Sequence, residues 1–292
     1  MSHSTLNHLA LQEKTRREIL HNSDLIPPLP DLVVRLLAVL NKQETEPRDL
    51  ERLMQNDQVL VAKMLAMVNS PFYGLNRTIR TVKEAVMVLG FRGVRSLVLA
   101  ASTAKFLQRD YSCYGYEAKG LWLHAACVAS AAKALAKVCR MGADEAEQLF
   151  VAGLLHDIGK LLLVPYMADQ KGICAAPAVT EFERQAIGID HTEAGALVTA
   201  KWNLAAEIRD VIKGHHDRPT APGDKGLAVV RLADAVAHER GIGYLPGKAP
   251  ACEVLPVDLA ALALSPESWS ATRDALSATM DEAITGLANL GN

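Results

Sequence analysis

The chain has few aromatic residues and few cysteines, and each shortage excludes a class of protein. Aromatic side chains make up 5% of the 292 residues and runs of β-branched residues are short, which disfavours a β fold because strands are rich in both. The five cysteines are an odd number, lie far apart and include no Cys-x-x-Cys pair. We therefore expect reduced thiols, with neither a disulfide framework nor a zinc ribbon.

Charge of one sign and long apolar runs are also lacking. The formal net charge is -2, so nothing in the composition attracts polyphosphate, and nucleic acid is not an expected partner. No uninterrupted apolar run approaches the roughly 18 residues needed to cross a bilayer. The first twenty residues lack the apolar stretch of a secretion signal. We therefore expect a cytoplasmic protein that does not bind membranes.

What the sequence does contain is a helical pattern. Ala, Leu, Glu, Lys and Arg recur at spacings of three and four residues, which predicts an all-α fold. Residues rich in Pro, Gly and Asp predict loops at 165–182, 217–225 and 241–250. The longer helices are expected at 119–140, 144–156, 191–202, 205–214, 226–240 and 267–290.

Breaks in this pattern predict four parts. The prolines of Pro27-Pro28-Leu29-Pro30 end a first helical segment, because proline lacks a backbone donor and clashes with the preceding turn. The pattern breaks again around residues 109–115. We therefore expect an N-terminal helical extension (1–24), a small N-terminal helical bundle (25–110), a larger helical domain packed against it (111–250) and a C-terminal helical tail (251–292).

Histidines are clustered in the second half of the chain. There is no histidine between His21 and His124, and His124 is then followed within a hundred residues by four more, at His156, His191, His215 and His216. Imidazole and carboxylate groups suit iron, manganese or zinc. Four further histidines are expected at the surface: His3, His8, His21 and His238.

The residues around His156-Asp157 are the strongest candidates for chemistry. A helix turns by about 100° per residue, so His156, Asp157 and Lys160 can face one pocket. A lysine there can meet an anionic oxygen, although Lys160 can equally be a solvated lysine beside a helix end. Asp190 is expected to cap the helix that begins at His191, with Glu193 as its reciprocal partner.

Asp234 is the other acidic candidate. It lies on an otherwise apolar helix face, where an unpaired carboxylate would cost several kcal/mol, so it needs a partner.

The chain resembles the HDOD domain, an HD-related output domain of bacterial signalling proteins, over residues 24–240. The resemblance is carried by Pro28-Leu29-Pro30, by the helix at 59–69 with the following Asn69-Ser70-Pro71-Phe72-Tyr73-Gly74, by residues 85–90 (Ala-Val-Met-Val-Leu-Gly) and by residues 154–159 (Leu-Leu-His-Asp-Ile-Gly).

The resemblance extends to the wider HD superfamily of metal-dependent phosphohydrolases. There the metal ligands come in the order His, then His-Asp, then a distant Asp, and this chain supplies His124, His156-Asp157 and Asp234. His191 and the pair His215-His216 are similar to the additional ligands of the two-metal branch. The resemblance thus implies a centre of two divalent transition-metal ions, with iron the first choice and manganese or zinc also compatible. It implies no organic cofactor.

The two-metal branch includes the HD-GYP phosphodiesterases of cyclic dinucleotides, from which this chain departs. Their Gly-Tyr-Pro motif does not follow His215-His216, and Gly243-Tyr244-Leu245-Pro246 comes only after Asp234. Cleavage of a cyclic dinucleotide is therefore not expected.

Three functional hypotheses follow. In the first, the protein is a regulatory HDOD protein that contacts signalling proteins, and its metal centre is a structural element or a ligand sensor. In the second, it is a phosphohydrolase acting on a nucleotide or other phosphoester, with catalytic roles for Asp157 and Lys160. A structural adaptor without metal ranks third. The sequence leaves the enzymatic activity and the oligomeric state open.

Overall fold

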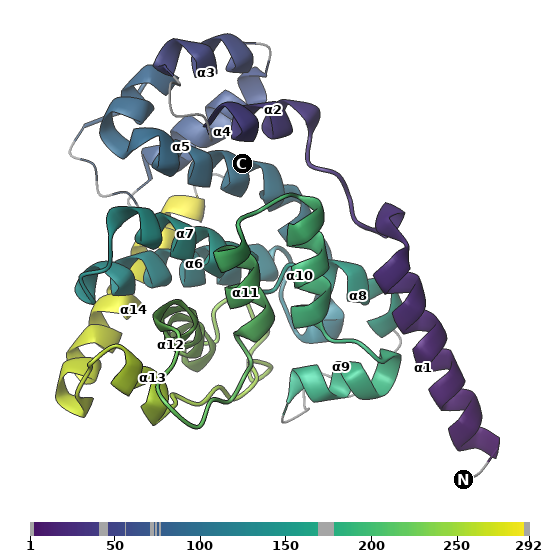
Figure 1. Ribbon diagram of the computed structural model, residues 1–292. Coiled ribbons are helices and arrows are strands. Elements are labelled where there is room, and N and C mark those ends of the chain that lie inside the picture. The colour runs from purple at the N-terminus through teal and green to yellow at the C-terminus, as the bar shows by residue number, and fades with distance from the viewer. Residues whose placement is uncertain are drawn as a thin grey trace.

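The structure is a computed structural model that describes residues 3–40, 46–55, 57–70, 73, 75, 77–168 and 178–288. Within these residues the regular structure is helical, apart from one isolated antiparallel bridge between Tyr116 and Tyr244. The predicted all-α fold is confirmed (Figure 1).

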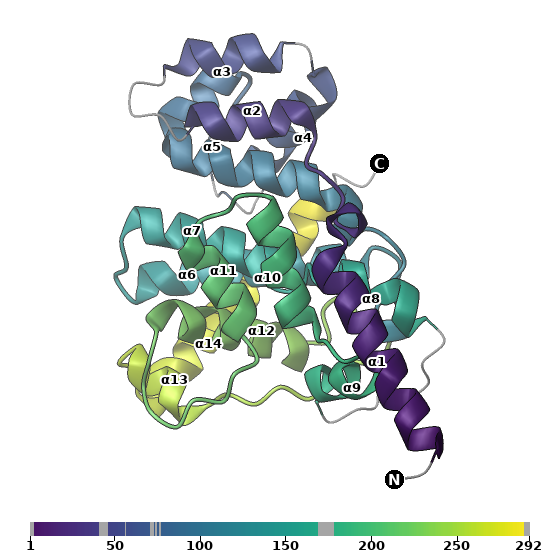
Figure 2. The same cartoon turned by 45° about the vertical axis from the view of Figure 1, so that its right-hand side comes forward.

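The first group of helices forms a small bundle at one end of the molecule (Figures 1 and 2). Its amphipathic helices bury their apolar faces against one another and against the first half of a long helix. The members are α2 (Asp31–Leu40), α3 (Pro47–Met54), α4 (Gln58–Val68) and α5 (Val82–Leu107). The preceding α1 (His3–His21) lies apart from this bundle, against two helices of the larger group.

The larger group is built around α6 (Gly120–Val138), which is buried along most of its length and packs against α7 (Ala143–Leu155), α12 (Lys225–Glu239) and α14 (Pro266–Ala288). Shorter helices complete the group. They are α8 (Lys160–Met167), α9 (Val179–Ile187), α10 (His191–Lys201), α11 (Ala206–Gly214) and α13 (Pro256–Ala261), with 3₁₀ turns at η1 (Ser23–Leu25) and η3 (Ser112–Tyr114).

Helix α5 connects the two groups and bends on the way. The helix has a kink at Gly90, whose φ of 69° and ψ of 174° are not helical. Glycine reaches a positive φ without steric cost. Beyond the kink, α5 packs against α6 and α7, so the bundle rests directly on the larger group.

The expected loop at 165–182 is too long. Helix α8 continues through Pro165 to Met167, and α9 begins at Val179. Pro165 is tolerated because Leu161, Leu162 and Leu163 bury this helix in the core. Helices α9 and α13 were not predicted, and residues 169–177 of the expected loop lie outside the described residues.

Three helical stretches are long and apolar enough, by average hydropathy, to span a membrane. They were not predicted from the sequence, in which no apolar run of this length is uninterrupted. They are Val82–Leu107, Gly120–Val138 and Ala143–Met167. In the structure, 61%, 72% and 83% of their apolar windows are buried against the rest of the protein. Their hydrophobicity is therefore accounted for by the core that they form.

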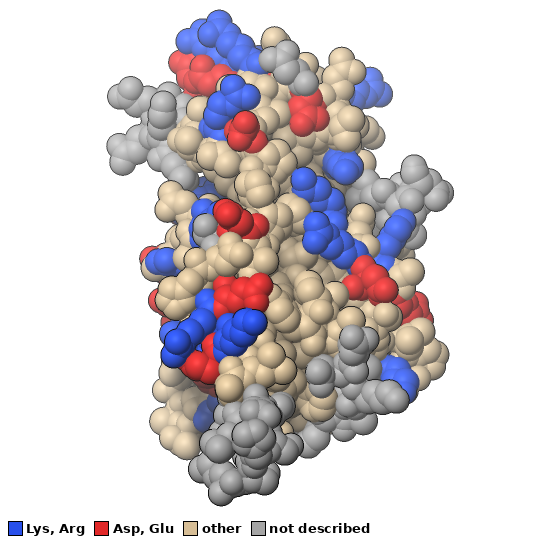
Figure 3. Space-filling view, turned by 90° about the vertical axis from the view of Figure 1, so that its right-hand side faces the viewer, with Lys and Arg blue, Asp and Glu red and all other residues tan. Residues whose placement is uncertain are grey.

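The surface charge is mixed on the face shown in Figure 3. On the described part of that face, Lys and Arg side chains are interspersed with Asp and Glu. This agrees with the small net charge of -2.

Candidate metal centre

Side chains from five helical segments converge in the larger group. The predicted metal ligands all lie here, together with one histidine that was not predicted, and most are buried. They are His124 on α6, His156 and Asp157 at the end of α7, His191 at the start of α10, His215 and His216 at the end of α11, and Asp234 and His238 on α12.

Local sequence explains how the end of α7 and the start of α10 come so close. Gly159 ends the His156-Asp157 turn, and a Cβ at this position would lie 1.9 Å from the carbonyl oxygen of His191. Asp190 caps α10 as predicted by accepting the backbone N–H groups of Thr192 and Glu193. The side chain of Glu193 pairs instead with Arg16, at 3.8 Å.

In three of the histidines, the ring is held in place by a hydrogen bond from its Nδ1. Nδ1 of His156 donates to the carbonyl oxygen of Gly153, and Nδ1 of His215 donates to that of Ile212, each at 2.7 Å. Nδ1 of His191 donates to a carboxylate at the same distance. In a neutral ring the hydrogen then resides on Nδ1 and the lone pair on Nε2. The lone pairs of all three rings are therefore free to bind a metal.

The free nitrogens face a carboxylate. Nε2 of His156, His191 and His215 and Oδ1 of Asp157 are buried and have no hydrogen-bond partner. Nε2 of His191 lies 3.3 Å from this oxygen and Nε2 of His215 lies 3.9 Å from it. Buried acceptors that face one another without a hydrogen between them are costly. A cation among them removes that cost, so these residues fit a divalent metal.

The potential ligand atoms fall into overlapping sets whose members lie within 4.8 Å of one another. Asp157 belongs to two of them, as a carboxylate that bridges two ions would. One set is Asp157, His191, His215 and His216, a second is His124, His156 and Asp157, and a third is His124, Asp234 and His238.

The two aspartates are ionised. Burial alone would raise the pKa of Asp157, but Lys160 and His156 outweigh it and hold that pKa well below the usual range. For Asp234 burial is likewise outweighed, by His238 and His124, and its pKa is also well below the usual range. Both carboxylates are thus available to a cation at neutral pH.

The imidazoles at the centre are mostly neutral. Burial lowers the pKa of His156 and, together with the neighbouring His156 and His191, lowers the pKa of His215 to about 3. Burial acts in the same direction on His191, but Glu183 overcomes it and raises that pKa. Neutral imidazole is the form that binds metals.

Lys160 is buried rather than solvated. Only 4% of the residue is exposed, and its Nζ donates to Oδ2 of Asp157 and to the hydroxyl of Tyr116, the latter at 3.4 Å. The interpretation of Lys160 as a solvated lysine at a helix end is therefore wrong. The carboxylate of Asp157 compensates for the cost of burying its charge.

Glu183 was missed by the sequence analysis. It is completely buried on α9, accepts the Nδ1 hydrogen of His191 at 2.7 Å and the hydroxyl hydrogen of Tyr114 at 2.7 Å. It lies between the expected loop at 165–182 and the expected helix at 191–202, where no element was predicted, so its contact with His191 was not foreseen.

Two tyrosines were also missed. Tyr244 donates to the hydroxyl of Tyr116 at 2.6 Å, and Tyr116 donates to Oδ2 of Asp157 at 3.1 Å. A Cβ at Gly243 would lie 2.2 Å from the carbonyl oxygen of Gly120, so glycine permits this close approach. Gly243-Tyr244, set aside because it follows Asp234, thus lies beside the centre.

His238 was expected at the surface, and that expectation is wrong. It is 8% exposed, and its Nε2 lies 3.3 Å from Oδ1 of Asp234. The signal was its position four residues after Asp234, which places both side chains on one face of α12.

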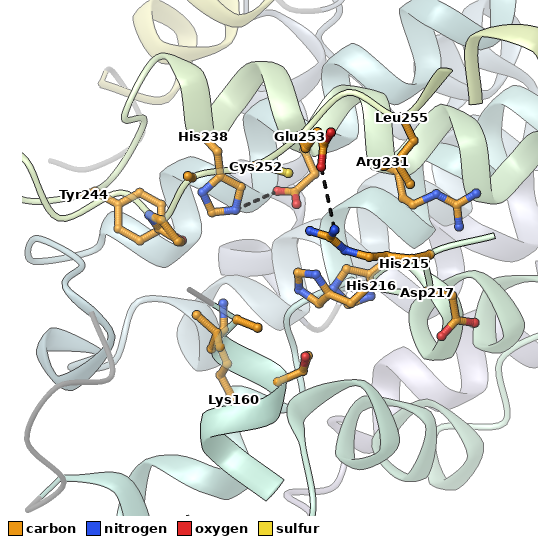
Figure 4. Close-up of a pocket in the computed structure, with 17 residues that line it drawn as sticks. Lys160, His215, His216, Asp217, Arg231, His238, Tyr244, Cys252, Glu253 and Leu255 are labelled. Atoms are coloured by element: carbon orange, nitrogen blue, oxygen red, sulfur yellow. Dashed lines mark ion pairs between the residues drawn. The ribbon is translucent and has the colours of Figure 1, made fainter. Parts of the chain in front are cut away.

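A cavity of about 140 Å³ reaches the centre from the surface. Lys160, His215, His216, His238 and Tyr244 line it (Figure 4). Arg218 and Glu253 also line the cavity, and their exposed side chains lie 3.7 Å apart. The fully buried His124, His156 and Asp157 lie behind this lining.

Comparison with known proteins gives the family. The HDOD domain matches residues 26–218. The chain belongs to the HDOD domain family. The match stops before Asp234, His238 and Tyr244, so part of the centre of this HDOD protein comes from beyond the matched residues.

Individual relatives agree with this assignment. The chain is similar to an HDOD domain protein of unknown function from Geobacter sulfurreducens, with 25% identity, a TM-score of 0.66 and coverage of 96% of this chain and 95% of that one. It has the fold of a "putative phosphohydrolase" from Shewanella amazonensis, with 21% identity, a TM-score of 0.71 and coverage of 93% and 97%.

A longer relative is known from Treponema pallidum. This "uncharacterized protein" is 27% identical over 245 residues, which are 81% of the HDOD protein described here. The HDOD protein spans only 46% of the length of that relative.

Proposed function

We propose that this HDOD protein is a metal-dependent phosphohydrolase with a two-ion centre, acting on a small phosphoester in the cytoplasm. The observation that carries the proposal is the set of unpartnered atoms around Asp157. Nε2 of His156, His191 and His215 faces the carboxylate from different helices, with its lone pair free. A cavity connects this set to solvent.

Seven residues would hold the ions. His124, His156, Asp157 and Asp234 would hold one ion, since the first three form one group and Asp234 lies within 3.6 Å of both imidazoles. Asp157, His191, His215 and His216 would hold the other. When bound, divalent ions supply positive charge that stabilises the charge developing on phosphoryl oxygens. Iron is the first choice for such an imidazole-rich set, and manganese and zinc are compatible with it.

Lys160 is the residue best placed to hold the substrate. Its ammonium group has three hydrogens, of which Asp157 and Tyr116 accept two. Lys160 also lines the cavity, so the third hydrogen is available to an anionic oxygen. The carboxylate of Asp157 accepts a hydrogen bond from the ammonium group and so fixes its direction.

The size of the cavity favours a small substrate. Pockets that enclose a drug-sized ligand usually measure about 300–1,000 Å³, against about 140 Å³ here. A phosphoryl group with a few further atoms fits inside, and the remainder of a nucleotide would stay at the rim beside Arg218 and Glu253. Neither nucleic acid nor a membrane is a proposed partner.

A regulatory function is the second candidate, and two observations favour it. The Treponema pallidum relative is more than twice as long as the matched part, as expected if such domains act together with others. Val59 and Met87, on α4 and α5 of the small bundle, are 66% and 62% exposed, which suits a contact with a signalling protein. In this reading the metal centre is structural or senses a ligand.

Metal content and turnover separate the two candidates. The protein as purified is analysed for metal, and phosphate release is followed on a panel of phosphomonoesters and phosphodiesters. About two equivalents of metal with turnover that is lost in His156→Ala would support the hydrolase, with His21→Ala as the exposed-histidine control. Metal without turnover on any of these compounds would favour the regulator. If the protein has no affinity for divalent metal, both the catalytic centre and the structural or sensing centre are ruled out.

A further inference from the structure

His238 is the one buried histidine at the centre that the HD-type order of ligands leaves without a role. It lies on α12, one turn after Asp234, and lines the cavity together with Lys160 and His215 (Figure 4). It also lies beyond the residues that match the HDOD family. Its role must therefore be derived from its own surroundings.

The distances around Asp234 are those of a coordination shell. Nε2 of His124 lies 3.0 Å and Nε2 of His238 lies 3.3 Å from the same carboxylate oxygen, Oδ1 of Asp234. Nε2 of His156 lies 3.6 Å from it. Ligand atoms at about 2.1 Å from one metal ion stand roughly 3.0–3.4 Å apart in octahedral or tetrahedral arrangements. His238 meets this condition as well as His124 does.

The two rings are alike in other respects. The His124 and His238 ring centroids are 4.9 Å apart, and both residues are buried. Nδ1 of each ring is buried without a hydrogen-bond partner. Without an ion, Nε2 of His124 is hydrogen-bonded to Oδ1 of Asp234, and Nε2 of His238 lies 3.3 Å from the same oxygen. No group holds Nδ1 of either ring, so the ring hydrogen can reside on Nδ1 and leave the Nε2 lone pair to a metal ion.

We propose that His238 is a direct ligand of the metal ion on the Asp234 side of the centre, together with His124 and Asp234. The inference rests on the proposed metal centre but not on hydrolytic activity. The ion on this side would be held by three imidazoles, those of His124, His156 and His238, and by carboxylates. An imidazole-rich set of this kind selects a transition ion against Mg²⁺, which prefers oxygen ligands and water.

The competing role for His238 is that of a positioning residue. In that case Nε2 would donate a hydrogen bond to Asp234 with or without metal, and the ring would never touch the ion. The two roles differ in where the Nε2 hydrogen resides after metal binding. A ligand loses it, whereas a positioning residue keeps it.

Nuclear magnetic resonance on the full chain distinguishes them. Protein labelled with ¹⁵N in histidine is loaded with ¹¹³Cd²⁺, and ring nitrogens bound to the ion are identified by scalar coupling to cadmium. We expect several Nε2 signals to be coupled to cadmium in the wild-type protein. One of them should disappear in His238→Gln, whereas His21→Gln should lose none. We also expect equilibrium dialysis to show that His238→Gln binds one of the two Cd²⁺ ions more weakly, by at least the roughly 10–100-fold that loss of an outer-shell partner costs.

Each outcome has a separate meaning. If other histidines couple to cadmium and His238 retains its Nε2 hydrogen, His238 is not a ligand, whatever the activity of the protein. If His238 couples to cadmium but the protein hydrolyses no phosphoester, the inference stands and the proposed hydrolase fails. If the wild-type protein takes up no Cd²⁺, both the centre and its ligand His238 are overturned.

Discussion

Oε2 of Glu183 lies 2.7 Å from Nδ1 of His191, and both residues are completely buried. The same oxygen accepts the backbone N–H of His191 at 3.0 Å. The carboxylate therefore fixes both the ring and the first residue of α10. It leaves the Nε2 lone pair of His191 directed at Asp157, 3.3 Å away.

Replacing this carboxylate should weaken metal binding. Glu183→Gln keeps the shape but removes the charge that makes His191 a better ligand, and loss of such a partner typically costs about 10–100-fold in metal affinity. Equilibrium dialysis against Zn²⁺ or Mn²⁺ measures the effect. Glu181→Gln, on the exposed face of the same helix, is the matched control. Equal affinities of the two variants would contradict the role of Glu183.

Acid should destabilise the metal-free protein. Burial lowers the pKa of His215 to about 3 and that of His238 to about 4, whereas histidine titrates near 6.5 in an unfolded chain. Below about pH 6.5 the unfolded state therefore binds more protons than the folded state. The free energy of unfolding should fall as the pH falls, by about 1.4 kcal/mol per pH unit for each such histidine.

The neighbouring groups do not cancel this effect between pH 6.5 and 5. His191 has a raised pKa, so its added stability is complete below about pH 6.5 and is lost only as the pH rises. Asp157 and Asp234 have lowered pKa values, and their contribution is lost only below about pH 4. Urea denaturation in a chelator at several pH values tests the slope, which should be smaller in His238→Gln. A free energy of unfolding that is the same at pH 5 and pH 7 would refute the prediction.

The parts of the centre that depend on local sequence could be predicted. His156 and Asp157 are adjacent at a helix end, and Asp190 is a capping residue that marks His191 as the first residue of a helix. The convergence of His124 and Asp234 on this turn was expected only from the order of ligands in a related superfamily. The structure brings these two residues together, although they are 110 positions apart in the sequence.

The parts that depend on tertiary contact could not be predicted. Glu183 lies on a helix whose hydrophobic pattern is short, and its partner His191 is reached only because the chain turns back at Gly188. Tyr244 lies in an irregular segment, where no periodicity indicates which side chains turn inward. His238 has the spacing of a neighbour of Asp234, but a polar residue near a helix end is usually exposed.

The ion pair between Arg231 and Asp258 should stabilise the wall of the cavity. Arg231 donates through two nitrogens to Asp258 and through a third to the carbonyl oxygen of Gly214, next to His215. Asp258→Ala would leave an almost buried guanidinium unpaired, and we expect a loss on the order of 3 kcal/mol in the free energy of unfolding. Asp274→Ala, whose side chain is 75% exposed, should change it by less than about 0.5 kcal/mol. Urea denaturation of both variants provides the comparison.

Lys160 should be needed for turnover but not for metal binding. Lys160→Met keeps the length of the buried stem while removing the donor that faces the cavity. Removing one donor to a reacting oxygen typically costs on the order of 10²–10³ in kcat, so phosphate release should fall by that factor while the metal content stays the same. Lys213→Met, an exposed lysine of α11, should leave both unchanged. If Lys160→Met loses its metal, the ammonium group serves to hold the carboxylate of Asp157 in place. If the variant keeps full activity, other groups hold the substrate. Either result would show that the role assigned to Lys160 is wrong.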